Sequence, residues 1–136
     1  MATYTKFNSF VEALAEKVHN LGSDTLKIAL TNSAPAASNT VLANITEVTY
    51  TNLSSRTLTV SSSAQTSGTY KLVVQDITLT SSGGTTGPFR YLVIYNDTAS
   101  NDELIAYYDY GTSITLLDGE QLQIDFDGTN GVLTIA

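Results

Sequence analysis

The chain has 136 residues, which suits a single domain, and its hydrophobic content of 42% is enough to build a core. Charged residues contribute only 14%, whereas 21 Thr and 14 Ser supply small hydroxyls, so a mainly β domain is favoured over a helical bundle. The net charge of −7 with six scattered bases disfavours partners such as nucleic acid or an anionic membrane, and the absence of Cys excludes disulfides and thiolate metal sites.

The first predicted element is an amphipathic helix at about 7–20. Its apolar stripe consists of Phe7, Phe10, Val11, Leu14, Val18 and Leu21. Ser9 and Glu12 match a capping box, and Gly22 is a natural stop. A single stripe must be covered, so we expect this helix to pack on its own sheet or on a neighbouring subunit.

After Gly22 the apolar period changes to two, which predicts a strand at 25–30 with Leu26, Ile28 and Leu30 facing inward. We then expect a polar loop at 31–40, a weak extended segment at 41–50, a strand at 56–60 and another loop at 61–68. A long strand at 70–80 needs a bulge or bend, because its apolar residues change phase after Val74.

The second half is denser in strands. Apolar residues on both faces of 89–95 indicate a central strand, and 104–108 is similar. Short strands are expected at 112–116, 120–126 and 131–135, joined by hairpin turns at Asp118-Gly119 and at Asp127-Gly128-Thr129-Asn130-Gly131. The predicted fold is one domain, 1–136, in which the helix precedes an antiparallel β-sandwich of jelly-roll type at about 25–135.

No pattern in the sequence indicates a catalytic, cofactor-binding or metal site. The single histidine, His19, is expected in the solvated last turn of the helix, without a nearby nucleophile or orienting acid. Glu103 with Asp109, and Asp125 with Asp127, share strand faces as a glycosidase pair would, but strand ends and turns explain them more simply. The run from Asp125 to Gly131 lacks the further ligands of an EF-hand, so we interpret it as a turn and not a calcium loop.

Aromatic and acidic residues are unevenly placed. Tyr107, Tyr108 and Tyr110 lie together on one predicted strand, where neighbours point to opposite faces, so at least one is expected to meet solvent or a partner. Together with Phe7, Phe10, Val11 and Leu14 of the stripe, these tyrosines are the predicted interface residues. Residues 91–136 contain eight acids and no base, a stretch suited to a basic partner surface.

The stretch from Phe10 to Asn32 resembles the start of a family of small structural proteins of tailed bacteriophages. The segments Gly87-Pro88-Phe89-Arg90-Tyr91, Tyr95-Asn96-Asp97-Thr98 and Asp125 to Leu133 are similar to that family too. Relatives with an assigned role resemble head decoration, or cement, proteins with a jelly-roll fold. The resemblance implies a non-enzymatic protein on the capsid exterior that binds the major capsid protein and forms a homo-oligomer, either a dimer or a trimer.

Two other functions stay open. One is a phage tail or fibre component with a glycan-binding sandwich, and the other is a small glycosidase. Because the N-terminus has no apolar run of signal-peptide length, we expect synthesis in the host bacterial cytoplasm before assembly into the virion.

Overall fold

The computed structural model describes residues 2–136. Within them the chain is mainly β, and a short α-helix and a 3₁₀ turn are its helical elements. In chain order the elements are β1 (Thr3–Lys6), α1 (Phe10–Ala15), β2 (Leu26–Thr31), η1 (Leu42–Asn44), β3 (Val60–Thr66), β4 (Thr69–Val74), β5 (Ile77–Thr80), β6 (Thr86–Asn96), β7 (Leu104–Leu116), β8 (Gln121–Ile124) and β9 (Leu133–Ile135).

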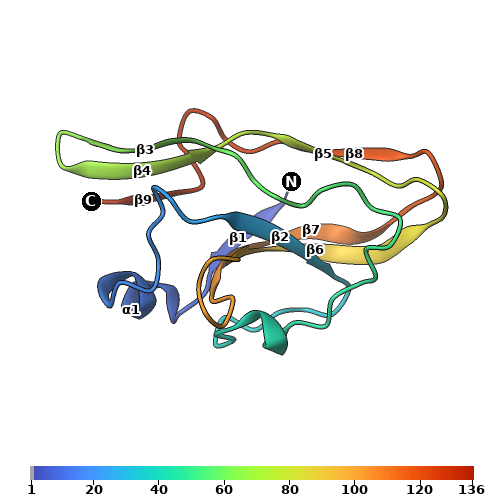
Figure 1. Cartoon of the computed structure of the whole chain (residues 1–136), viewed down its shortest axis with the longest axis horizontal. Coiled ribbons are helices and arrows are strands. Elements are labelled where there is room, and N and C mark those ends of the chain that lie inside the picture. The colour runs from blue at the N-terminus through green and yellow to red at the C-terminus, as the bar shows by residue number, and fades with distance from the viewer. Residues whose placement is uncertain (1) are drawn as a thin grey trace.

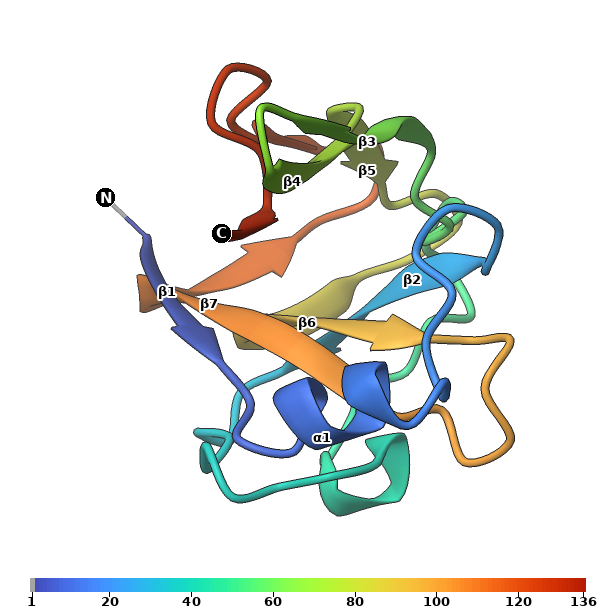
Figure 2. The same cartoon turned by 90° about the vertical axis from the view of Figure 1, so that its left-hand side faces the viewer.

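The strands form two facing layers, as Figure 1 and the end-on view of Figure 2 show. One layer is a four-stranded antiparallel sheet in the order β1-β7-β6-β2. The other layer contains a three-stranded sheet, β3-β4-β9, and a two-stranded sheet, β5-β8, which lie end to end (Figure 1). The mainly antiparallel β class is confirmed. These strand orders do not contain the two four-stranded sheets of a jelly roll. The jelly-roll topology therefore stays a prediction.

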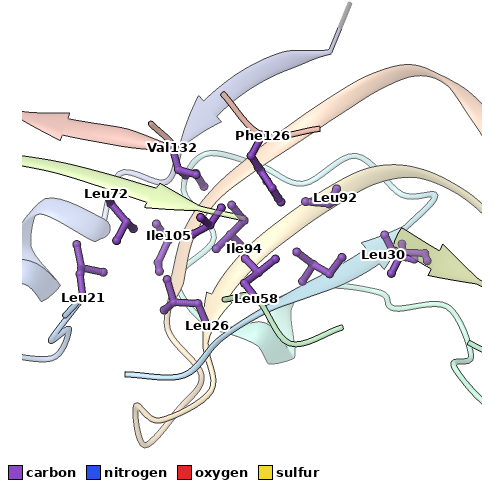
Figure 3. Close-up of a cluster of buried hydrophobic side chains, with 14 of the residues drawn as sticks. Leu21, Leu26, Leu30, Leu58, Leu72, Leu92, Ile94, Ile105, Phe126 and Val132 are labelled. Carbon is purple, nitrogen blue, oxygen red and sulfur yellow. The ribbon is translucent and has the colours of Figure 1, made fainter. Parts of the chain in front are cut away.

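The main core fills the space between the layers. Leu26, Leu30 and Ile94 from the four-stranded sheet meet Leu72 and Phe126 from the opposite layer (Figure 3). The inward orientation predicted for Leu26, Ile28 and Leu30 is confirmed, because each is at most 1% exposed.

A second apolar cluster covers the outer face of the four-stranded sheet. It consists of Phe7, Ala29, Ile45, Val93, Tyr95 and Leu104, with Leu42 and Tyr107 packed against it. The loop that carries η1 supplies Leu42 and Ile45, so β2 and β6 are covered on both faces. This explains why 89–95 is apolar on both faces, and β6 is indeed central, between β7 and β2.

The helix is much shorter than predicted. It covers six residues, Phe10–Ala15, and ends because Lys17 adopts a positive φ of 69° that breaks the helical path well before Gly22. The Ser9 side chain makes no capping hydrogen bond, so the expected capping box is absent. Residues 3–6, for which no element was predicted, form the edge strand β1.

Two further corrections concern polar segments. The stretch 61–68, predicted as a loop, contains most of β3 and the turn to β4, where Ser67 (φ 50°) and Gly68 (φ 86°) have the paired positive φ angles of a tight hairpin. The extended segment expected at 41–50 is instead the 3₁₀ turn η1 with irregular chain after it. The strand expected at 56–60 is irregular from Arg56 to Thr59 except for a single bridge, Lys27 with Thr57, and only its last residue, Val60, belongs to a strand, β3.

The predicted bend in 70–80 is confirmed, because β4 ends at Val74 and β5 begins at Ile77 in a different sheet. The stretches 104–108 and 112–116 are one strand, β7. The turns at Asp118-Gly119 and Asp127–Gly131 exist, but the predicted hairpins are wrong: β8 pairs with β5 and β9 pairs with β4. Turn residues fix a change of direction, whereas the pairing partner is set by tertiary packing.

Candidate functional site

A groove lies between α1 and β9 on the surface of the described chain. One hollow of about 360 Å³ is lined by Lys6, four residues of α1 and all of β9. A second hollow of about 470 Å³ follows the chain from the end of α1 to Gly22 and is closed by Ser63, Tyr70 and Ile135. Because the two hollows share Leu14, Ala15 and Ile135, they form one surface, the α1–β9 groove.

Aliphatic side chains in this groove face solvent. Val11 is 54% exposed on α1 and Ile135 is 41% exposed on β9. On the neighbouring β1, Tyr4 is 39% exposed. These residues gather large apolar side chains at one end of the sandwich, and such clusters mark interaction surfaces more often than isolated apolar residues do.

Two sheet edges border the same end of the molecule. β9 pairs only with β4, and β1 pairs only with β7, so each strand leaves one row of backbone N–H and C=O groups without a sheet partner. An exposed edge is a template for strand addition by another chain. Both edge strands are short, three and four residues, which limits uncontrolled association.

Charge distinguishes the groove from the rest of the surface. Lys6 and Lys17 line its two hollows, and neither makes an ion pair within the described residues. The other bases are engaged: Lys27 with Asp97, Arg90 with Asp109, Lys71 with the Thr129 carbonyl, and Arg56 with the Ile28 carbonyl and the face of Tyr50. In a chain of net charge −7, the ammonium groups available to a partner therefore flank the apolar groove.

The predicted stripe residues divide between interior and surface. Phe7 is fully buried in the outer cluster, and Phe10 is 3% exposed in the main core, so neither offers its ring to another subunit. Val11 and the half-buried Leu14 line the α1–β9 groove. The difference follows from the length of α1. The helix begins only at Phe10 and covers about a turn and a half, so it does not hold all four side chains on one face.

The predicted tyrosines also separate, as the alternation of a strand requires. Tyr107 packs beside Phe7 on the outer face, with ring centroids 5.2 Å apart. Tyr108 lies on the inner face between Tyr4 and Phe126, at 5.3 and 6.1 Å. Burial and the neighbouring Tyr108 raise the pKa of Tyr4 to about 12, so its hydroxyl stays neutral. Tyr110, at 49% exposure, is the most exposed tyrosine of this group.

The first carboxylate pair considered for glycoside hydrolysis, Glu103 with Asp109, does not come together. Glu103 precedes β7 and Asp109 lies six residues later, a separation of roughly 20 Å along a strand, beyond the reach of a glycosidase pair. Asp109 instead accepts two hydrogen bonds from Arg90, at 2.8 and 3.1 Å. The hydrogen bond from Arg90, with a second from the Gly111 N–H, lowers the pKa of Asp109.

The loop from Asp127 to Gly131 is held by its own hydrogen bonds. Asp127 accepts the backbone N–H groups of Thr129 and Asn130 and the Asn130 amide, all at 2.8–2.9 Å. These bonds lower the pKa of Asp127 and occupy both carboxylate oxygens. Across residues 2–136 no group of three His, Cys, Asp or Glu side chains is arranged to hold a metal ion.

His19 is not in a solvated helical turn. It is only 5% exposed and stacks on Phe10, with ring centroids 5.3 Å apart. Its Nδ1 lies 3.0 Å from the Asn96 amide nitrogen, which also donates to Asp24 at 2.7 Å. Asp24 is therefore linked to the imidazole through Asn96, but His19 Nε2 has no hydrogen-bond partner among the described residues.

Sequence reasoning missed Tyr4, Lys6 and Ile135. The signal for Ile135 was present, because 131–135 was predicted as a strand, but its expected partner was β8 and not β4. For Tyr4 and Lys6 the available signal was the alternation Thr3-Tyr4-Thr5-Lys6, which is typical of a strand with few apolar residues.

Searches of the chain against family models, curated proteins and solved structures find no match. Among the described residues, no helix is long and apolar enough to cross a membrane. The class that the structure itself defines is a small antiparallel β domain with an apolar groove beside two of its sheet edges.

Proposed function

We propose that this chain is a non-enzymatic virion protein that binds and reinforces the outer surface of a phage head, as a capsid decoration or cement protein. The observation that carries the proposal is the α1–β9 groove, an apolar surface beside two free sheet edges in a domain with few charges. The resemblance of the Phe10–Asn32 stretch to phage structural proteins supports the same assignment.

The surface chemistry suits permanent assembly. Covering a charged surface costs free energy unless each charge finds a partner, whereas covering apolar side chains and hydroxyls costs much less. At the groove, Val11, Leu14 and Ile135 supply area that gains stability when it leaves water. Lys6 and Lys17 at its margin are available for carboxylates of the major capsid protein or of a second copy.

Seven of the eight acidic residues beyond Arg90 occupy three separate loops, and the eighth, Asp109, lies in β7. Asp97, Asp102 and Glu103 lie between β6 and β7, Asp118 and Glu120 lie between β7 and β8, and Asp125 and Asp127 lie between β8 and β9. The first loop lies at the α1 end of the sheet and the second at the opposite end (Figure 1). Contacts between acidic loops and basic capsid surface would therefore be made at several points around the domain.

The decisive experiment locates the chain on purified particles of the phage that encodes it. Quantitative mass spectrometry should find it in hundreds of copies per particle, and cryo-electron microscopy should place it on the outside of the head lattice. A few copies confined to the tail would instead support the alternative function, a tail or fibre component. Absence from purified particles would refute both assignments.

One observation favours the tail or fibre function as a second candidate. Tyr110 is 49% exposed, and tyrosine rings stack on sugars. A glycan array with the purified chain tests it, with Tyr110→Ala as the variant and Tyr107→Ala, whose ring packs beside Phe7, as the comparison. Binding that is lost with Tyr110→Ala alone supports glycan recognition, and no binding on the array argues against it.

A further inference from the structure

The buried cluster around His19 joins two distant parts of the chain. His19 and Asp24 lie in the segment between α1 and β2, and Asn96 is the last residue of β6. Asn96 is completely buried, and its amide nitrogen lies 3.0 Å from His19 Nδ1 and 2.7 Å from Asp24 Oδ2. The segment 19–24 is thereby attached to the start of the β6–β7 loop.

The orientation of the Asn96 amide is fixed by the backbone. Its Oδ1 accepts the N–H groups of Thr98 and Ala99, at 3.0 and 3.2 Å, so the opposite side of the amide must be the nitrogen. One amide hydrogen is donated to Asp24 and the other to His19. His19 Nδ1 is therefore an acceptor, and the neutral ring carries its proton on Nε2.

The surroundings of the ring oppose a positive charge. Nε2 is buried without a hydrogen-bond partner, and Phe10 covers one face of the imidazole. Burial lowers the pKa of His19, although the carboxylates of Glu103 and Asp24 act in the opposite direction. Lys17 and Tyr70 line the same hollow from the α1 end and from β4.

We propose that His19, Asn96 and Asp24 form an acid-sensitive latch that holds the segment 16–25 against the β6–β7 loop. A proton on Nδ1 would turn that atom into a donor facing the Asn96 N–H. Asn96 cannot rotate to offer its oxygen without releasing Thr98 and Ala99. The protonated ring is therefore expelled to solvent, and the segment that lines the second hollow of the α1–β9 groove separates from the loop.

The direction and size of the effect follow from linkage. The open state contains a solvated imidazole of ordinary pKa, about 6.5, whereas the closed state holds the ring neutral. Above pH 6.5 the equilibrium constant for opening the latch does not change with pH, and below pH 6.5 it increases as the pH falls. At pH 5.5 the open state should be favoured more than at pH 7.5 by a factor of up to about ten, the limit for a closed ring that stays neutral, because one pH unit below the pKa corresponds to a factor of ten. This inference goes beyond the proposed capsid function and does not depend on it.

Amide hydrogen exchange by NMR on the full chain tests the latch. The probes are the N–H groups of Thr25, Thr98 and Ala99, which bond within or beside the cluster. The amides of Val93 and Ile94, in the centre of the sheet, serve as internal controls. After correction for intrinsic exchange, protection of the three probes should fall from pH 7.5 to 5.5, by up to about tenfold, and protection of the controls should not change.

The matched variant is His19→Asn, which places a non-titrating amide oxygen near the position of Nδ1. Since His19 is the chain's single histidine, the variant should show no change in probe protection over this pH range. The ring itself should titrate below 6.5 in the wild-type protein.

The latch is refuted if the His19 ring titrates at or above 6.5, if the probes keep their protection at pH 5.5, or if His19→Asn loses protection to the same extent. Should His19→Asn fail to fold, the ring titration and the wild-type exchange decide the matter without it.

Discussion

The four-stranded sheet and the layer opposite it are built in different ways. In the first, β6 and β7 are 11 and 13 residues long, and clusters of buried side chains cover both faces of its centre. In the second, β5, β8 and β9 have only three or four residues each, and many of their side chains are exposed. Both layers contribute to the main core, but the difference indicates that burial stabilises the first layer at both faces, whereas the short strands of the second rely more on turns and loops for their position, including β9 beside the groove.

The largest expected effect compares an isoleucine from each layer. Ile94→Ala removes a side chain that is 1% exposed at the centre of β6, and we expect it to lower the free energy of unfolding by about 2–5 kcal/mol. Ile135→Ala, at a position 41% exposed, should cost roughly 1 kcal/mol or less. Urea denaturation followed by circular dichroism measures both, and equal losses would contradict the comparison.

The next effect concerns the backbone that leads into β9. Gly131 has a φ of 80°, and a Cβ there would lie 2.6 Å from the Leu72 carbonyl oxygen. Gly119 has a similar φ of 85° with open space around it. Gly119→Ala should therefore cost only the conformational strain, about 1 kcal/mol, and Gly131→Ala should cost roughly 1–3 kcal/mol more. If thermal unfolding shows the two variants to be equally stable, the close approach of Gly131 does not position β9.

The smallest effect concerns the ion pair on the four-stranded sheet. Arg90 lowers the pKa of Asp109, so this pair stabilises the fold above the ordinary Asp pKa of about 3.8, and that contribution is lost as the pH falls through the lower folded value. We expect Arg90→Gln to be slightly less stable than wild type at pH 7. Urea titrations between pH 2.5 and 7 should show the two proteins converging below about pH 4. A difference that persists at pH 2.5 would assign the loss to packing of the arginine stem.

The two layers also differ in how far the sequence predicts them. The segment 25–30 alternates large apolar residues and 89–95 carries them on both faces, and these patterns predicted β2 and the centre of β6. β3 was missed because its sequence, Val60 to Thr66, is mostly Ser, Thr and Gln, and its strand state depends on pairing with β4. Long-range pairing of short polar strands leaves little trace in local sequence.

The candidate site was predictable only in part. The helical spacing of Phe7, Phe10, Val11 and Leu14 located the right segment but could not tell which of them would be exposed. The turn at Lys17, a non-glycine residue with positive φ, shortens the helix and carries His19 inward to Asn96, 77 positions away. No periodic pattern reports a contact of that kind, so both the buried histidine and the groove became visible only in three dimensions.

The central claim is that the α1–β9 groove attaches this chain to the head lattice. The most direct measurement is the number of copies bound to undecorated heads as a function of protein concentration, which gives the affinity. Val11→Glu places a charge in the groove, and Leu117→Glu makes the same change at a residue 57% exposed outside it. We expect saturating binding by wild type and Leu117→Glu, and at least a tenfold weaker affinity for Val11→Glu, in line with the loss of a central apolar contact. Equal binding by all three proteins, or binding by none, would contradict the claim.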